Sequence, residues 1–359
     1  MPEPERREEY QVGRIGVAVI GAGGENIATG CHLPALKHVP EMELRLLHDV
    51  NEEGVRRTAQ TYGVDWTTNF EDVLTRDDID LVQICSPDPF HASQSVAALD
   101  AGKHVLCQKP LALSVEELES MSVAAVRSEG QFQGCQHRRY EAWARASHAA
   151  IQRGDIGEPV YGRFQVKGRF YPYPQDSFYR TAESGGQFVH NGMHYVDVLC
   201  YLMDTLPVEV FARSARHYPT ADRLESDNYL SCMTKMENGA QAWIELNLMM
   251  VDPPLTPAEE RVIIIGTQGT LRLGNEDNPN FEAFTPGGSV RTRVNPLIHV
   301  ANPFVLQFRE FAHTILTGRP NAIPFHFSAR VMETCLAAVE SAGTGEPVKL
   351  RDWLERGVQ

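Results

Sequence analysis

The chain is poor in basic residues and has no uninterrupted apolar run of membrane-spanning length. It carries 33 Lys and Arg residues against 47 Asp and Glu residues, which gives a formal net charge of −14. Nucleic-acid binding requires clustered positive charge, so we expect no nucleic-acid partner. The longest apolar segments have the length of strands rather than the roughly twenty residues of a spanning helix. Residues 1–12 are polar and do not fit a secretory signal, and we expect no membrane anchor.

Cysteines are few and scattered. The seven of them are odd in number, widely spaced and mostly set in apolar runs, as at residues 82–85. This pattern is typical of reduced thiols in the core of a cytoplasmic protein and argues against a disulfide framework. With 42% hydrophobic and 22% charged residues, the 359-residue chain has the composition of a globular protein long enough for two domains.

The first part of the chain alternates short apolar runs with amphipathic stretches. Such alternation predicts a doubly wound parallel sheet with helices on both faces, in an N-terminal domain spanning residues 1–135. The expected strands are 15–20, 44–47, 81–85, 105–106 and a run near 132, and the expected helices are 25–37, 51–62, 89–101 and 114–127.

The pattern changes beyond residue 135. Consecutive strand-like runs joined by turns at 237–239 and 266–269 predict a mostly antiparallel sheet, in an α+β domain spanning residues 136–359. The expected strands are 160–170, 208–215, 229–235, 241–248, 261–265 and 270–273, and the expected helices are 141–153, 186–203, 304–317 and 328–343.

A glycine cluster follows the first predicted strand. Gly21, Gly23 and Gly24 stand where a dinucleotide fold brings backbone amides against a pyrophosphate, since any side chain would hold the phosphates away. The third glycine of the usual fingerprint is missing. Either Asn26 takes its place, or the loop is two residues longer and Ala28 has the close-packing role. Alone, the cluster is equally compatible with an ordinary strand-to-helix turn.

Asp49 ends the second predicted strand. A carboxylate there can accept both ribose hydroxyls of the adenosine half of a dinucleotide and repels a 2′-phosphate, so NAD is favoured over NADP. The alternative is that Asp49 only caps the helix that begins near residue 51.

Two longer stretches carry a family resemblance. Residues 85–91 (CSPDPFH) lead to 98–111, which contain Gln108, Lys109 and Pro110, and residues 184–197 (SGGQFVHNGMHYVD) follow later. Together with 32–36, 154–157 and 345–350, they resemble the glucose-fructose oxidoreductase, inositol dehydrogenase and MocA family over nearly the whole chain. The resemblance implies an NAD-binding Rossmann domain, an open-faced second sheet that mediates homodimers or homotetramers, and sugar or inositol substrates.

The resemblance also assigns roles to residues. Ser86 and Pro87 would line the nicotinamide-side ribose, and His91 would open the next helix. Lys109 matches the family's lysine, and His194 matches the histidine that serves as acid and base in many members. The sequence departs from the family twice, because Gln108 replaces the usual glutamate and His190 stands where many relatives have an aspartate.

The chemistry can be argued without the family. Oxidation of a secondary alcohol needs a group that takes the hydroxyl proton and a group that holds the charge developing on oxygen, which a lysine and a histidine supply. We therefore expect Lys109 and His194 at the reacting oxygen, with His190 in contact with a substrate hydroxyl or in the proton relay. Both departures remove negative charge, so we expect a less basic lysine than in the relatives.

Several residues have competing interpretations. His190 and His194, at i and i+4 spacing, could bind zinc or form a structural pair, but no third ligand is indicated and we expect no metal site. Arg138 at the domain junction is either a substrate contact or a solvated charge. The remaining expected substrate contacts are Asn191, Tyr173 and Arg180, the last two in an aromatic loop that could stack on a sugar or form a simple surface flap.

We therefore expect an NAD-dependent enzyme acting on a sugar or polyol, in a direction that the sequence leaves open. Two alternatives share the fold: a sugar sensor that binds dinucleotide without turnover, and a glycosidase that oxidises and re-reduces its substrate with tightly held NAD. Retention of Lys109 and His194 argues against a sensor, because a sensor needs neither.

Overall fold

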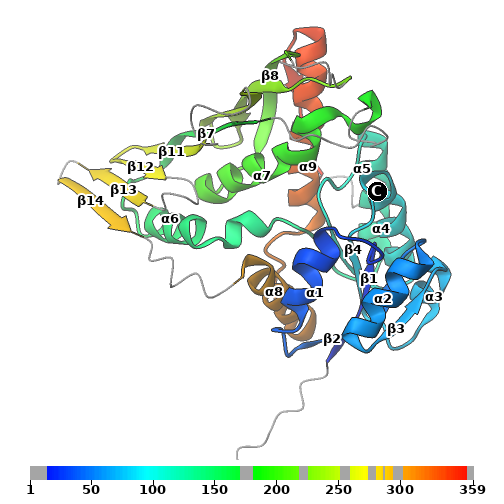
Figure 1. Ribbon diagram of the computed structural model, residues 1–359. Coiled ribbons are helices and arrows are strands. Elements are labelled where there is room, and N and C mark those ends of the chain that lie inside the picture. Colours follow the sequence, from blue (N-terminus) through cyan, green and yellow to red (C-terminus); the bar gives the residue numbers. More distant parts are fainter. Residues whose placement is uncertain are drawn as a thin grey trace, which may run out of the picture.

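A computed structural model describes residues 14–169, 181–217, 225–250, 259–273, 280–285, 288–293 and 302–353, so residues 1–12 lie outside the described part. In it the chain forms two sheets (Figure 1). The first has the strand order β3-β2-β1-β4-β5-β6, and its described pairs are all parallel, as predicted. Its strands are β1 Ile15–Ile20, β2 Met42–His48, β3 Asp65–Thr67, β4 Leu81–Ile84, β5 His104–Cys107 and β6 Phe132–Gly134.

Strand β1 packs into two separate cores because its side chains alternate between the faces of the sheet. Val17 and Val19 belong to one core with helices α1 (Leu33–Leu36), α2 (Glu52–Tyr62) and α8 (Pro303–Thr317). Ala18 and Ile20 belong to the other, with α4 (His91–Asp100) and α5 (Val115–Arg127). Helix α8 therefore returns from the C-terminal part of the chain to the first sheet (Figure 1). The predicted domain division at residue 135 stays a prediction.

The helix expected over 25–37 is wrong at its start. The loop continues to residue 27, followed by a π-helical turn, η1 (Ala28–His32), and the short α1. Asn26 holds this loop, since its Nδ2 donates to the Gly21 carbonyl at 2.8 Å and its Oδ1 accepts from the N–H of Ala28 at 2.9 Å. Strand β3 and helix α3 (Phe70–Thr75) were not predicted, because both are short.

The second sheet has the order β14-β13-β12-β11-β7-β10-β9-β8-β15 and is antiparallel except for the pair β7 and β10. Helices α7 (Gly186–Met203) and α9 (Phe325–Thr344) pack against it, and α6 (Ala142–Gln152) packs on α7 (Figure 1). The strands are β7 Pro159–Arg169, β8 Pro207–Ala215, β9 Tyr229–Met236, β10 Gln241–Met250, β11 Glu259–Gly266, β12 Thr270–Leu273, β13 Asn280–Thr285, β14 Gly288–Arg293 and β15 Val348–Lys349.

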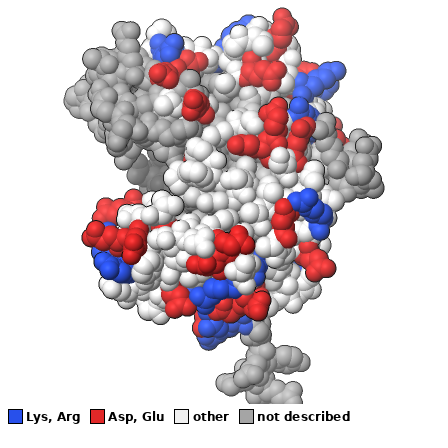
Figure 2. Space-filling model, turned by 90° about the vertical axis from the view of Figure 1, so that its right-hand side faces the viewer, with Lys and Arg blue, Asp and Glu red and all other residues white. Residues whose placement is uncertain are grey.

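Charged side chains of both signs lie interspersed around a broad band of uncharged surface on the face shown in Figure 2. Among the described helices, none combines the length and the apolar character that crossing a membrane requires.

Candidate functional site

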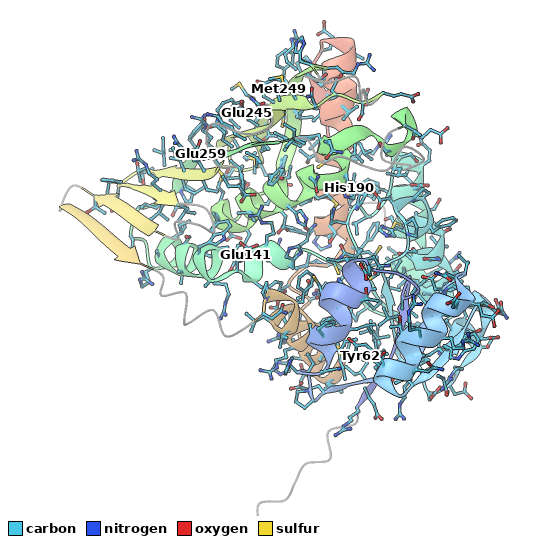
Figure 3. The ribbon with its side chains drawn as sticks, viewed as in Figure 1. Tyr62, Glu141, His190, Glu245, Met249 and Glu259 are labelled. Atoms are coloured by element: carbon cyan, nitrogen blue, oxygen red, sulfur yellow. The ribbon has the colours of Figure 1, made fainter. Side chains whose placement is uncertain are left out.

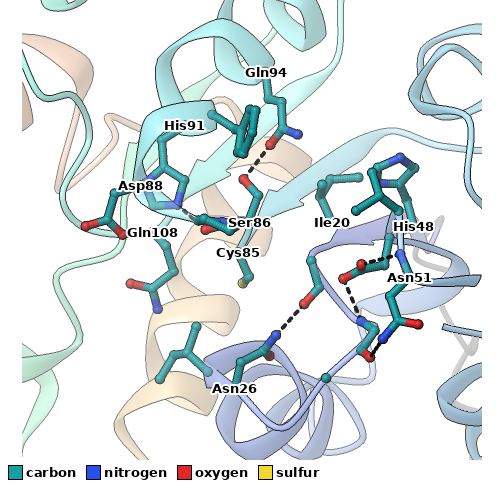
Figure 4. A pocket seen from close by; sticks show the side chains of 18 of the residues that line it. Ile20, Asn26, His48, Asn51, Cys85, Ser86, Asp88, His91, Gln94 and Gln108 are labelled. Carbon is teal, nitrogen blue, oxygen red and sulfur yellow. Dashed lines mark hydrogen bonds between the residues drawn. The ribbon is translucent and has the colours of Figure 1, made fainter. Parts of the chain in front are cut away.

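A cavity of about 640 Å³ lies at the carboxyl ends of strands β1, β2, β4 and β5 (Figure 4). Open parallel sheets bind their ligands at this edge, and the volume is in the usual range for a ligand pocket. Its lining includes the predicted cofactor residues of the glycine loop, the second strand and the segments after the fourth and fifth strands: Gly21, Gly23, Gly24, Asn26, Asp49, Ser86, Pro87, His91, Gln108 and Lys109.

The glycine loop is shaped by two close approaches. Gly21 has a φ of +84°, and a Cβ atom there would lie 2.5 Å from the carbonyl oxygen of Cys85. A Cβ at Gly23 would lie 2.5 Å from Cγ of Asp49, whereas one at Gly24 would meet no atom within 4 Å. The loop therefore needs glycine in order to fold, and its backbone is open to a bound molecule at Gly24.

Asp49 is fixed by two backbone groups and still lines the cavity. Its Oδ2 accepts from the N–H of Gly23 at 2.7 Å, and its Oδ1 accepts from the N–H of Asn51 at 2.9 Å. The residue that caps α2 is Asn51, whose side chain accepts from the N–H of Gly54 at 3.1 Å. Each carboxylate oxygen retains a further lone pair, so the Asp49 carboxylate can accept a pair of hydroxyls as well. The glycine loop and Asp49 thus fit a dinucleotide with an unphosphorylated ribose.

His91 joins two walls of the cavity. Its Nδ1 lies 2.6 Å from the Pro110 carbonyl oxygen and its Nε2 lies 2.7 Å from the Ser86 carbonyl oxygen. The ring is 1% exposed. The side chain of Ser86 donates to Oε1 of Gln94 at 2.6 Å (Figure 4). The ring of His91 therefore lies between the Ser86 and Pro110 segments, and each tautomer of the neutral ring can donate to one of the two carbonyls.

The amino group of Lys109 reaches across to helix α7. Its Nζ lies 3.0 Å from Nε2 of His190, 3.1 Å from the His190 carbonyl oxygen and 3.5 Å from Oδ1 of Asn191. Burial lowers the pKa of Lys109 to about 8, and the negative charge of Asp88 acts in the opposite direction. Such a group exchanges its proton near neutral pH, as acid–base catalysis requires.

His190 lies between Lys109 and an unpredicted residue, Asp88. Figure 3 labels His190 on α7. Its Nδ1 lies 2.8 Å from Oδ2 of Asp88, which belongs to the short helix η2 (Asp88–Phe90) and is 4% exposed. Because both ring nitrogens of His190 face protein groups, the zinc interpretation finds no support. The signal for Asp88 was its position between Pro87 and Pro89, in the short segment that follows a buried strand.

His194 lies one turn farther along α7 and is not among the described residues that line the cavity. Its ring packs edge-to-face on His137 at 4.9 Å, and His137 stacks on Phe304 at 4.5 Å. Burial, followed by the nearby charges of His137 and Lys109, holds the pKa of His194 well below its usual value. A histidine with a low pKa is a weak proton acceptor. The predicted role of His194 as base stays a prediction.

The other predicted substrate residues are placed differently. Arg138 is buried, and it forms a paired contact with Glu260 on β11, at 3.1 and 2.5 Å, and a further contact with Glu141 at 3.3 Å. Tyr173 and Arg180 lie outside the described residues.

Comparison with known proteins assigns the family. A model of the oxidoreductase family with an NAD-binding Rossmann fold, GFO_IDH_MocA, matches residues 15–134, and a model of the C-terminal domain of the same family matches residues 144–272. The chain belongs to this oxidoreductase family. The resemblance, the fold class and NAD as the cofactor are thereby confirmed.

The oxidoreductase is similar to proteins from several bacteria. It is 26% identical to the oxidoreductase YrbE of Bacillus subtilis, over 94% of this chain and 97% of that protein. It is also 26% identical to inositol 2-dehydrogenase 3 of Saccharopolyspora erythraea, over 94% and 96% of the two chains. An oxidoreductase from Agrobacterium radiobacter, solved with NAD+, L-tartaric acid and magnesium, shares the fold with a TM-score of 0.83 and 19% identity, over 94% and 98% of the two chains.

Proposed function

We propose that the oxidoreductase transfers a hydride between NAD and a secondary alcohol or ketone of a sugar, an inositol or a related polyol, with Lys109 at the reacting oxygen. NAD supplies the hydride acceptor or donor when bound. The observation that carries the proposal is the position of Lys109, which lines the same cavity as the glycine loop and Asp49 and whose amino group contacts His190 on helix α7. The similarity to an inositol 2-dehydrogenase over 94% of this chain supports the substrate class.

The contacts of Lys109 are suited to proton exchange. A protonated amino group has three hydrogens. Nε2 and the carbonyl oxygen of His190 accept two of them at 3.0 and 3.1 Å, whereas Oδ1 of Asn191 lies at 3.5 Å, the limit of a hydrogen bond, so the third hydrogen can point to a substrate oxygen. A neutral amino group keeps a lone pair that can take the hydroxyl proton of an alcohol, while the protonated form can donate to a ketone oxygen. The same residue therefore serves both directions.

Lys109 and His190 are half-buried at the wall of the cavity. Of the two roles expected for His190, contact with a substrate hydroxyl or a place in the proton relay, its contacts favour the relay through Lys109, because both ring nitrogens face protein groups. We expect His194 to act behind it. We assign Asn191, which is half-buried beside Lys109, to a further substrate hydroxyl.

A panel of sugars and inositols, assayed separately with NAD and NADP, tests the proposal. We expect formation of free NADH with at least one polyol. A glycosidase would instead cleave a chromogenic glycoside without net NADH, and a sensor would bind dinucleotide and sugar without turning either over. Either result would contradict the proposal.

We also propose that two or more copies associate through the second sheet. Large apolar side chains are exposed on one face of its strands, among them Met233 at 54%, Ile265 at 39% and Phe284 at 40%. Isolated apolar residues are common at surfaces, but several on one sheet favour a protein interface. Light scattering of the intact protein tests this, and a monomer at micromolar concentration would contradict it.

A further inference from the structure

We propose that Asp88 is a positioning residue, which holds the ring of His190 so that Nε2 accepts a hydrogen bond from the amino group of Lys109. The inference deepens the proposed function and rests on it for its catalytic consequence. The three side chains come from separate elements: η2 after β4, the segment after β5, and α7. They form a continuous series of contacts of 2.8 Å and 3.0 Å.

The direction of each hydrogen bond follows from the chemistry of the groups. An ionised carboxylate can only accept, so Nδ1 of His190 must carry the hydrogen that points to Asp88. In a neutral ring Nε2 then has a lone pair and can only accept, and Lys109 must donate. The opposite tautomer would place an N–H against the amino group and leave the buried carboxylate of Asp88 without this donor.

The ionisation of the groups agrees with this arrangement. Burial acts to raise the pKa of Asp88, but the hydrogen bond from His190 and nearby positive charges outweigh it, and the pKa lies below its usual value. Burial and the charge of Lys109 lower the pKa of His190, which favours the neutral ring.

The charges around Lys109 come from several elements. The charge of Asp88 on η2 raises the pKa of Lys109 and so opposes burial. The charge of Lys109 in turn lowers the pKa of His137 in η3 (His137–Tyr140) and of His194 in α7. His91, at the start of α4, contributes to lowering the pKa of both Asp88 and His190. Since Asp88 favours the protonated amino group, its removal should make Lys109 more acidic.

The experiment compares Asp88→Asn, which keeps an acceptor and removes the charge, with Asp88→Ala, which removes both. In the oxidation direction kcat/KM should rise with pH as Lys109 loses its proton. We expect this rise to occur about one pH unit lower in Asp88→Asn. We expect Asp88→Ala to lose about 10–100-fold in kcat, with a smaller change in the KM for substrate. Asp100→Asn, at the far end of the adjoining helix α4, is the matched control and should leave the profile unchanged.

A second readout needs no turnover. Imidazole nitrogen NMR of the full-length protein, with the His190 signals assigned by their loss in His190→Gln, should show hydrogen on Nδ1 in the natural protein and a mixed or reversed tautomer in Asp88→Ala. An unchanged tautomer, or a pH profile of Asp88→Asn that coincides with that of the natural protein, would overturn the inference. A tautomer that depends on Asp88 in a protein without dehydrogenase activity would contradict the proposed function and leave the positioning role intact.

Discussion

The side-chain amide of Gln108 bridges His32 and the backbone of Lys109. Its Nε2 donates to Nε2 of His32 at 2.7 Å, and its Oε1 accepts from the N–H of Lys109 at 2.9 Å. The second bond fixes the orientation of the amide, so His32 must accept with Nε2. Burial, assisted by His137, lowers the pKa of His32 to about 3, which keeps the ring neutral as this bond requires.

Replacing Gln108 by Glu should make Lys109 more basic. The added carboxylate lies next to the lysine and stabilises the protonated amino group, so the pKa of Lys109 rises from about 8. Oxidation requires the neutral amine, and we expect the rising limb of kcat/KM to move to higher pH. Gln108→Met, which adds no charge, should leave the limb in place. A Gln108→Glu enzyme with an unmoved limb would show that the family's glutamate has no bearing on the lysine.

Replacing Lys109 by Met should remove most of the activity and little of the dinucleotide binding. Loss of an acid–base group costs about 10²–10⁴-fold in kcat. In the natural protein we expect oxidation to accelerate, and reduction to slow, as the pH rises through about 8. Lys109→Arg keeps the positive charge but cannot lose its proton, so we expect its kcat for oxidation to fall nearly as far as that of Lys109→Met. Steady-state kinetics measures the loss of kcat, and a fluorescence titration with NAD measures dinucleotide binding. A Met variant with more than about a tenth of the natural kcat would refute the assignment.

Replacing Asp49 by Asn should weaken the preference for NAD. The carboxylate repels a 2′-phosphate, and its removal should lower the ratio of kcat/KM for NAD over NADP by about tenfold or more. Glu52→Gln, at the exposed start of α2, removes a charge from the same edge without lining the cavity and should leave the ratio unchanged. A preference that survives in Asp49→Asn would mean that another group excludes the phosphate.

Replacing Asp197 by Asn should destabilise the fold. Asp197 is 0% exposed and accepts hydrogen bonds from Arg139, which is also buried and would be left without its charge partner. Breaking such a pair costs about 3–5 kcal/mol of unfolding free energy. The exposed pair Arg153 and Asp155 provides the control, since Asp155→Asn should cost less than about 1 kcal/mol. Urea unfolding measures both, and equal costs would contradict the argument.

Much of the fold was predictable from local patterns. Alternating apolar runs identified the strands of the first sheet other than β3. Side-chain caps at Asn51 and Ser114 begin helices α2 and α5 where the sequence indicated. Short elements such as β3 and α3 carry too few residues for a periodic signal. The expected helix over residues 25–37 began late because the side chain of Asn26 bonds to the loop backbone, a local competition that periodicity does not register.

The sequence by itself determined the class of chemistry. The cofactor requires glycines after one strand and a carboxylate after the next, and the reaction requires the lysine and histidines that occur in the family's order. Only the tertiary structure decided which of these groups meet. Asp88 and His190 are far apart in the chain, and they meet, together with Lys109, where α7 reaches the segments that follow β4 and β5. Burial there, rather than residue type, also lowers the pKa of the lysine into the working range, since it depends on how much protein surrounds the charge.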